Sequence, residues 1–360
     1  MEISQNLRKS VVNLKINTGI IGYGMSAQVF HAPFIHANPN FKISKIVERH
    51  KQKSKEEYPY IDVVSSADDL FQDESIQLVV ITTPNESHYS LAKNALSAGK
   101  HVIIEKPLTI TSKEADDLIS IANDNGLILS VYQNRRWDGD FLTVKKILNQ
   151  GSLGKLVEYE SHFDRFRNYF KPDAWREKNV PGSGILYDLG PHLIDHALQL
   201  FGNPNEVTAD IHIQREGGQT DDHFEVKLHY DQLKVTLKAG MLVREPSPRF
   251  ILYGTQGTFI KYGLDPQEAD SKSGMSPLHP NWGVDDQSNW GTLNTNINGL
   301  HFRGKIETLR GCYQKFYENI YEVITNKKTL AVKPEEARNV IKIIELAFQS
   351  SREKKTITFK

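Results

Sequence analysis

The sequence INTGIIGYGMSA, residues 16–27, decides the first half of the fold. Its apolar beginning is typical of a buried strand, and its end has the spacing G-x-G-x-x-A. The following segment, AQVFHAPFIHANP, is expected to form a helix. A glycine turn between a strand and a helix lets the backbone approach a pyrophosphate at the positive helix N-terminus. A tight turn without a ligand is the alternative. The residues expected to contact a dinucleotide here are Gly22, Tyr23, Gly24, Met25, Ser26 and Ala27.

Apolar and helical segments alternate after this turn. The further strands are expected in FKISKIVER, QLVVITTP, HVIIEKP and LILSVYQN, which are nearly all apolar, as in a parallel sheet covered on both faces. In TSKEADDLISIANDNG, Thr111 and Glu114 have capping-box spacing and Gly126 supplies a stop. This alternation predicts a Rossmann-type, doubly wound parallel sheet over residues 15–135. Residues 1–14 are expected to form an N-terminal arm.

The second half of the chain has a different period. Apolar and polar residues alternate in KLVEYESHFD, EVTADIHIQRE, DHFEVKLHY and LKVTLKAGMLV, which indicates strands with one packed face. The segment KPEEARNVIKIIELAFQSSREKK has the pattern of a long amphipathic helix, whereas residues 263–300 look loop-like. We therefore expect a second α+β domain over residues 136–360, with a large, mostly antiparallel open sheet. The overall class is α/β.

Composition limits the class of protein. Lys plus Arg and Asp plus Glu each number 44, so the formal charge is zero and no bulk field favours nucleic acid or anionic lipid. Cys312 is the only cysteine, which excludes an intrachain disulfide. The N-terminal residues are polar, and no apolar run approaches the roughly 18 residues of a membrane span. We expect a cytoplasmic protein without nucleic-acid or membrane partners.

The end of the second strand should lie near the adenosine ribose of a bound dinucleotide. Glu48 could accept hydrogen bonds from both ribose hydroxyls, which favours NAD. Arg49 could face a 2′-phosphate, which favours NADP. A solvated surface pair is the alternative. The sequence leaves NAD versus NADP undecided.

Two further motifs carry ionisable groups. Glu105 and Lys106 end an apolar strand, at the sheet edge where ligands bind, and both are candidate cofactor contacts. Asp188 and His192 are four residues apart, so on a helix they share one face. In a dehydrogenation, a histidine could take the alcohol proton, a carboxylate could steady it, and a lysine could hold the developing alkoxide. Lys106 could instead reach solvent, and His192 could be a packed core residue.

A metal site is the other possibility for this helix. Asp188, His192 and His196 have possible metal-ligand spacing, but no fourth ligand is evident, so no metal is expected. The other histidines, such as His31 and His36, are expected to be structural.

Three separated motifs together resemble the Gfo/Idh/MocA oxidoreductase family: GIIGYGMSAQVFHAPFI, ITTPNESHYSLAKNALSAGKHVIIEKPL and YDLGPHLID. The segments LSVYQNRRWDGDFLTVKKI, AWREKNVPGSGILYDLGPH and FIKYGLDPQE are similar to its NADP-dependent scyllo-inositol dehydrogenase branch. The resemblance implies that Lys106, Asp188 and His192 are catalytic. It also implies that Thr83, Pro84, Asn85 and His88 line the dinucleotide, and that Trp175 and Arg176 reach the cleft. Glu48 departs from the short polar residues of that branch.

The resulting hypothesis is an NAD(P)-dependent dehydrogenase of a small polyol or sugar. Candidate residues for recognising substrate hydroxyls are Tyr132, Arg165, Arg167, Trp175 and Arg176. Two alternatives stay open: a redox-neutral glycosidase that retains NAD, and a non-catalytic regulator that senses the cofactor on the same fold. The open sheet of the family pairs subunits, which implies a homodimer or homotetramer.

Overall fold

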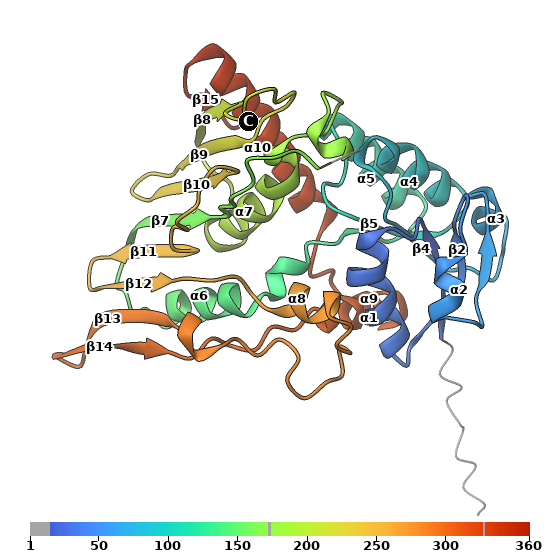
Figure 1. The fold of residues 1–360 in the computed structure, drawn as a ribbon, viewed down its shortest axis with the longest axis horizontal. Helices are drawn as coiled ribbons and strands as arrows, with labels where there is room; N and C mark the ends of the chain where they lie inside the picture. Colours follow the sequence, from blue (N-terminus) through green and yellow to red (C-terminus); the bar gives the residue numbers. More distant parts are fainter. Residues whose placement is uncertain (1–14, 172–173, 327) are drawn as a thin grey trace, which may run out of the picture.

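The computed structural model describes residues 15–171, 174–326 and 328–360. Figure 1 shows two sheets side by side, each flanked by helices. The predicted arm over residues 1–14 lies outside the described residues. Among those described, no helix combines the length and the apolar content that a membrane crossing needs.

The first sheet has six strands in the order β3-β2-β1-β4-β5-β6, and every neighbouring pair is parallel. Its strands are β1 (Ile16–Ile21), β2 (Phe41–Val47), β3 (Asp62–Val64), β4 (Leu78–Ile81), β5 (His101–Ile104) and β6 (Leu129–Val131). The predicted Rossmann-type sheet is confirmed. Strand β3 escaped prediction because three residues with no fully buried side chain carry too short a pattern.

Helices cover both faces of this sheet. They are the π-helical turn η1 (Ala27–His31), α1 (Ala32–Ala37), α2 (Lys53–Glu57), α3 (Asp68–Phe71), the 3₁₀ turn η2 (Asn85–Ser87), α4 (His88–Ser97) and α5 (Ser112–Asp124). The predicted helix after the glycine turn is present as one continuous helical run, whose first part is the π-helical η1 and whose second part is α1. Pro33 has no N–H to donate to the preceding turn, which favours an irregular turn at this point. The capping box of Thr111 and Glu114 is present at α5.

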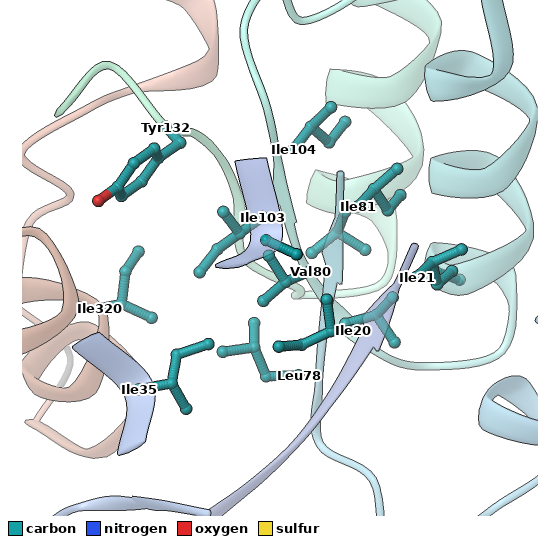
Figure 2. Packing of buried hydrophobic residues seen from close by; sticks show 14 of the residues in the cluster. Ile20, Ile21, Ile35, Leu78, Val80, Ile81, Ile103, Ile104, Tyr132 and Ile320 are labelled. Atoms are coloured by element: carbon teal, nitrogen blue, oxygen red, sulfur yellow. The ribbon is translucent and has the colours of Figure 1, made fainter. Parts of the chain in front are cut away.

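The core of the first sheet is built from the apolar strands and includes residues from the far end of the chain. Ile20, Val80 and Ile103 are fully buried on one face. Figure 2 shows Ile320 beside them; this residue belongs to α9 (Gln314–Asn326). Trp282, Tyr313 and Phe316 lie in the same cluster. The predicted domain division near residue 136 remains a prediction, because the later chain returns to complete the first core.

The second sheet has nine strands in the order β14-β13-β12-β11-β7-β10-β9-β8-β15. Only β7 and β10 pair in parallel, so the expected mostly antiparallel sheet is confirmed. Along β9, Phe224, Val226 and Leu228 are buried while their neighbours are half-buried. The strands are β7 (Leu156–His162), β8 (Glu206–His212), β9 (His223–His229), β10 (Lys234–Gly240), β11 (Phe250–Gly254), β12 (Gly257–Lys261), β13 (Gly291–Ile297), β14 (Leu300–Ile306) and β15 (Ile357–Thr358).

The loop-like interpretation of residues 263–300 is wrong in part. This segment contains α8 (Gln267–Lys272), the 3₁₀ turn η5 (Gln287–Asn289) and all of β13. Strand β13 reads GTLNTNI, and its asparagines and threonines hide the apolar alternation.

Two long helices pack on the inner face of the second sheet. Helix α7 (Ile185–Phe201) packs on β10, and α10 (Pro334–Glu353) packs on β8 and α7. Helix α10 also packs against α5, so it connects the two halves (Figure 1). The remaining helical elements are η3 (Asn134–Trp137), α6 (Gly139–Asn149) and η4 (Trp175–Glu177).

Candidate active site

The glycine turn follows β1 and is held against the neighbouring strand end. Gly22 has a φ of +93°, and a Cβ there would lie 3.3 Å from the Thr82 hydroxyl. That hydroxyl contacts the carbonyl oxygens of Ile21 and Gly22 at 3.1 and 3.0 Å. A side chain at position 22 would be strained and crowded, so glycine is required. At Gly24 a Cβ would meet no atom within 4 Å, which leaves the backbone open on this side.

A hollow of about 690 Å³ lies beside this turn. It is lined by several residues expected to contact the cofactor: Gly22, Tyr23, Glu48, Arg49, Thr83 and Pro84. Met25, Ser26, Glu105 and Lys106 instead line a second cavity. The predicted cofactor residues that line a space thus form two groups, one in each of the two spaces beside the glycine turn.

Four predicted cofactor residues line neither space. Gly24 is exposed and Ala27 is fully buried. The Asn85 amide donates to the carbonyl of Gly182 at 2.8 Å, and so contacts the loop before α7. The His88 ring is fully buried between the carbonyl oxygens of Pro107 and Thr83, at 2.8 and 2.9 Å. Asn85 and His88 are therefore placed to hold the backbone around the site.

Glu48 has a partner that the sequence did not indicate. Its carboxylate accepts from the backbone N–H groups of Lys53 at 3.1 Å and Ser54 at 2.9 Å, and from the Ser54 hydroxyl. These donors begin α2, whose first N–H groups have no partner within the helix. Glu48 therefore satisfies the start of a helix, while Arg49 remains on the wall of the hollow.

The second cavity, of about 270 Å³, brings together residues that are far apart in the sequence. Its lining includes Lys106, Asp188 and His192, together with Arg165, Arg167, Trp175 and Arg176. Ser26 of the glycine turn lies on the same wall. The three residues expected to be catalytic thus share one cavity with four of the five expected substrate contacts.

Asp188 is positioned by the start of α7. Gly184 precedes the helix with a φ of +90°, and a Cβ there would lie 2.0 Å from the Asp221 carboxylate. That carboxylate accepts from the Leu186 N–H at 2.8 Å. Glycine at position 184 therefore lets Asp221 reach the helix end, which sets Asp188 in the first turn.

Lys106 and Asp188 form the central ion pair. The Lys106 ammonium donates to the backbone carbonyl of Asp188 at 2.5 Å and to its carboxylate at 3.2 Å. Burial lowers the pKa of Lys106, while the charge of Asp188 opposes this shift. Burial would raise the pKa of Asp188, but the charges of Lys106, Arg176 and Arg165 lower it. Asp188 is therefore an ionised carboxylate at neutral pH.

His192 lies one turn further along α7 and is almost buried, with 6% of its surface exposed. Its Nδ1 has no hydrogen-bond partner among the described residues. Burial, and then the charges of Lys106 and Arg135, lower the pKa of His192 well below its usual value. The imidazole is therefore neutral, which is the form that a general base needs. The expected carboxylate support is absent within the described part of the chain: Asp188 contacts Lys106, and no hydrogen bond joins it to His192 there.

Two arginines share the Asp188 carboxylate. Arg176 Nε lies 3.3 Å from one oxygen, and an Arg165 Nη lies 3.6 Å from the other. The Arg176 guanidinium also stacks 4.5 Å from the ring centre of Trp175. Three cations thus surround one carboxylate, so the wall is rich in hydrogen-bond donors.

The expected role of Tyr132 in substrate recognition is contradicted. Figure 2 shows its ring among the core residues of the first sheet, and only 1% of its surface is exposed. The ring packs at a tilt against His31 and edge-on against Phe316. The side chain at the end of β6 points under the sheet, away from the cavity.

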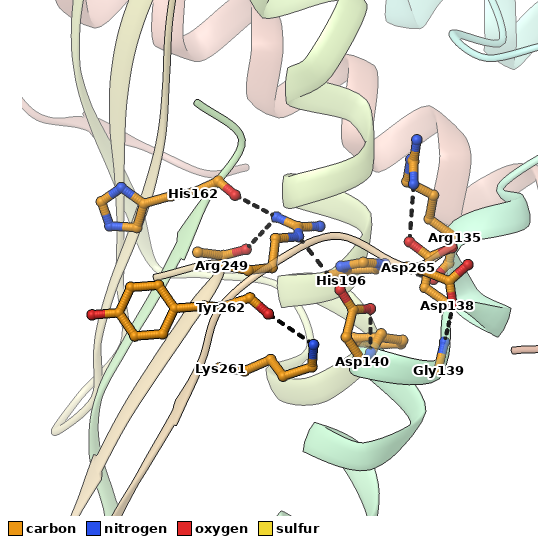
Figure 3. Close-up of polar contacts among 12 residues, drawn as sticks. Arg135, Asp138, Gly139, Asp140, His162, His196, Arg249, Lys261, Tyr262 and Asp265 are labelled. Carbon is orange, nitrogen blue, oxygen red and sulfur yellow. Dashed lines mark hydrogen bonds and ion pairs between the residues drawn. The ribbon is translucent and has the colours of Figure 1, made fainter. Parts of the chain in front are cut away.

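Arg135, three residues later, lines the cavity and was missed by the sequence reasoning. Its guanidinium contacts Asp138 at 3.1 Å and Glu268 of α8 at 2.6 Å. Figure 3 shows Arg135 and Asp138 near Asp265, which accepts from the Gly139 N–H at 2.6 Å. The signal that could have found Arg135 is its place just after a parallel strand, at the ligand-binding edge.

His196 belongs to this buried cluster. It lies 2.9 Å from the carbonyl of Arg135, and its ring stacks on Phe141 at 3.9 Å. Across residues 15–171, 174–326 and 328–360, no group of three or more His, Cys, Asp or Glu side chains could hold a metal ion.

The residues of the turn fit a dinucleotide. The open backbone at Gly24, the left-handed Gly22 and the adjoining hollow leave space where a pyrophosphate and a nucleoside can lie. The cavity with Lys106 and His192 begins on the other side of the same turn.

Comparisons with known proteins agree with this geometry. The oxidoreductase-family profile described as NAD-binding Rossmann fold matches residues 16–133, and the profile described as C-terminal alpha/beta domain matches residues 145–359. The chain is 41% identical to scyllo-inositol 2-dehydrogenase (NADP(+)) IolW of Bacillus subtilis, over 97% of each chain. A solved oxidoreductase from Bacteroides fragilis is 48% identical, with a TM-score of 0.89, covering 96% of this chain and 100% of that one. The oxidoreductase yvaA of Bacillus subtilis is 40% identical, with a TM-score of 0.94, covering 96% and 99%.

Proposed function

This chain belongs to the Gfo/Idh/MocA oxidoreductase family, and on that premise we propose that it is an NAD(P)-dependent dehydrogenase of a cyclic polyol or sugar. The reaction transfers a hydride between a hydroxyl-bearing carbon and the nicotinamide. A scyllo-inositol-like substrate is favoured by the relative that carries this name. The observation that carries the proposal is the meeting of Lys106, Asp188 and His192 in one cavity beside the glycine turn.

The proposed roles follow from charge and protonation. His192, neutral and with a free Nδ1 among the described residues, takes the proton of the substrate hydroxyl. Lys106 stabilises the negative charge that develops on that oxygen. Asp188 holds the Lys106 ammonium through its backbone carbonyl and its carboxylate. Arg165, Arg167, Trp175 and Arg176 offer donors and an apolar surface to the remaining hydroxyls.

The glycine turn would hold the dinucleotide. Gly22, Tyr23, Thr83 and Pro84 would line its adenosine side, and Ser26 would lie toward the nicotinamide. When bound, the nicotinamide supplies the acceptor for the hydride. The protein's own residues position the substrate carbon and remove the hydroxyl proton.

The test is a panel of inositols and hexoses assayed with NADP and NAD separately. We expect activity on a cyclic polyol or sugar, and a loss of at least about a hundredfold in kcat for His192→Ala, the lower range for a missing general base. His301→Ala, at an exposed histidine of β14, is the matched control and should keep wild-type turnover. Unchanged turnover in His192→Ala would remove this residue from the mechanism.

The pH profile supplies a second readout of the same group. The base form of His192 is required, so oxidation should fall as the pH drops through its pKa. Because that pKa is lowered, the fall should begin below about 6.5, the usual histidine value. A profile that already declines above pH 7 in the wild type and is unchanged in His192→Ala would contradict the assignment.

We propose that NADP is the preferred cofactor. The Glu48 carboxylate is engaged by the three donors at the start of α2, while Arg49, His50 and Lys51 line the hollow. A cationic wall suits a 2′-phosphate better than a ribose hydroxyl. The relative named as NADP-dependent agrees with this preference.

We also propose that the protein is a cytoplasmic homodimer or homotetramer, in which the outer face of the nine-stranded sheet pairs subunits. The mixed polar face along β9 and the family resemblance support this assembly. Light scattering on the purified chain measures the oligomer mass, and a monomer at micromolar concentration would exclude it.

A further inference from the structure

A buried hydrogen-bond network connects the glycine turn to a helix near the end of the sequence. His31, at the end of η1, is fully buried, and both of its ring nitrogens contact side chains. Nδ1 lies 2.6 Å from the Tyr317 hydroxyl, and Nε2 lies 3.0 Å from Glu105 Oε1. Tyr317 belongs to α9, which packs against α1. No sequence pattern distinguishes His31 from a packed histidine.

Glu105 lies at the centre of this network. The Oε1 atom that faces His31 also accepts from the Ser26 hydroxyl of the glycine turn. Its Oε2 accepts from the backbone N–H of Lys106 at 3.1 Å. One carboxylate therefore contacts both the proposed cofactor turn and the backbone of the proposed catalytic lysine.

The protonation states set the donor and acceptor of each hydrogen bond in this network. Burial alone would raise the pKa of Glu105, but the hydrogen bonds from His31 and Ser26 and the charge of Lys106 lower it to about 2. Burial raises the pKa of Tyr317 well above its usual value, so its hydroxyl keeps its proton. All groups are satisfied when Tyr317 donates to Nδ1 and the Nε2–H of His31 donates to Glu105. In this arrangement the ring acts as a hydrogen-bond relay between a hydroxyl donor and a carboxylate acceptor.

We propose that His31 and Tyr317 are positioning residues that fix the Glu105 carboxylate, which in turn holds Ser26 at the cofactor turn and Lys106 at the reacting carbon. The part that concerns Lys106 rests on the proposed function, whereas the part that concerns the turn does not. Holding groups in their productive geometry before the ligand arrives lowers the cost of binding and reaction.

The first test replaces the imidazole of His31 by an aromatic ring that has no nitrogen atoms. His31→Phe keeps an aromatic ring against Tyr132 and removes both hydrogen bonds. We expect NADPH, titrated by tryptophan fluorescence, to bind about ten- to a hundredfold more weakly, the range for a lost hydrogen bond to a charged group. Amide exchange in residues 22–28 of the cofactor-free protein should also become faster. His31→Gln, which can still donate to Glu105, should recover part of both losses.

A matched control lies on the next helix. His36 of α1 contacts the Tyr60 hydroxyl at 2.9 Å, so it also pairs an imidazole with a phenol. It is exposed, however, and among the described residues it makes no contact with Glu105. His36→Phe should leave NADPH affinity and exchange at residues 22–28 unchanged. An equal effect of both histidine variants would overturn the relay, because it would indicate a general loss of structure.

A milder pair of variants keeps the proposal testable if His31→Phe does not fold. Tyr317→Phe removes one hydroxyl, and Ser26→Ala removes the donor at the other end. In a double-mutant cycle on NADPH affinity, the two losses should be strongly non-additive, since both act through Glu105. Additive losses of NADPH affinity, or no loss, would contradict the inference. If NADPH affinity and exchange respond as expected but no polyol or sugar is turned over, the relay stands and the proposed function fails.

Discussion

At the scale of single residues, Glu48 shows how one carboxylate can serve a purpose other than the one its position suggests. Its place at the end of β2 favoured contact with ribose hydroxyls. In the structure its oxygens accept from Lys53 and Ser54 at the start of α2. The competing donors are five and six residues further on, and no spacing rule for Rossmann turns includes them. We therefore propose that the cationic residues after Glu48, which line the hollow, contact the cofactor.

The first prediction at this scale concerns cofactor choice. Arg49→Gln should reduce kcat/KM with NADPH by about tenfold or more, because a charge-assisted bond to phosphate is lost, and should leave the value with NADH nearly unchanged. Ser54→Ala removes one of the two donors to Glu48 Oε1, which loosens the hold on this carboxylate, and should also lower the NADPH-to-NADH ratio. The control is Arg352→Gln, at an exposed arginine of α10. An unaltered ratio in Arg49→Gln would contradict the proposed NADP preference.

Much of the candidate site could be anticipated from residue types and spacing. Lys106 at a strand end and the Asp188–His192 pair on a helix are local patterns, and the structure places all three in one cavity. Tyr132 and Arg135 show where prediction of the site from the sequence fails. Both follow the same strand, but Tyr132 packs under the sheet and Arg135 lines the cavity. Arg135 lies within the 3₁₀ turn η3, which begins two residues after Tyr132 and leaves no clear signal in the sequence.

At the scale of elements, local capping chemistry was predictable, whereas short or polar strands were not. Helix α5 begins at the predicted capping box, because Thr111 and Glu114 satisfy each other's backbone N–H groups at 3.0 to 3.2 Å. Strand β13 was hidden by its polar composition, and β3 was too short for a pattern. Periodicity therefore finds elements that bury a full apolar face, and it misses strands at or next to a sheet edge that bury little.

Removing the α5 cap gives a prediction for one element. Thr111→Ala should lower the free energy of unfolding by about 1 kcal/mol, the usual value of an N-cap. The melting temperature should fall by a few degrees, while kcat stays at the wild-type value because α5 lies outside the cavity. Thr329→Ala, at an exposed threonine beyond α9, should change neither. A wild-type melting curve for Thr111→Ala would show that other contacts hold this helix start.

At the scale of the whole molecule, the two sheets are joined by helices from the second half of the chain. Helix α10 packs on β8 and on α5, and its Glu345 accepts from both the N–H and the hydroxyl of Ser112 at 2.8 and 2.7 Å. Residues Trp282, Tyr313, Phe316 and Ile320 lie in the core of the first sheet. The sequence indicated two sheets in the right order, but it could not show that the second half completes the first core.

This packing predicts the behaviour of a truncated chain. A fragment ending at residue 135 lacks several large apolar side chains of its core, each worth about 1.5–3 kcal/mol when buried. Together they rival the about 5–15 kcal/mol that stabilises a typical domain. We expect the fragment to bind a hydrophobic dye and to melt without a cooperative transition by circular dichroism, unlike the full chain. A fragment that melts cooperatively near the full-length temperature would contradict this expectation and support the division at residue 136.

The return of α9 beneath the first sheet also constrains how the protein is made. The six parallel strands leave the ribosome long before Tyr317 and Ile320 exist, so part of their apolar underside stays uncovered while more than half of the chain is still being synthesised. The Rossmann half is therefore the first part to be translated and one of the last to be finished. On the positioning role proposed for His31, the cofactor turn of the nascent protein reaches its final form only when His31 meets a helix that is added near the end.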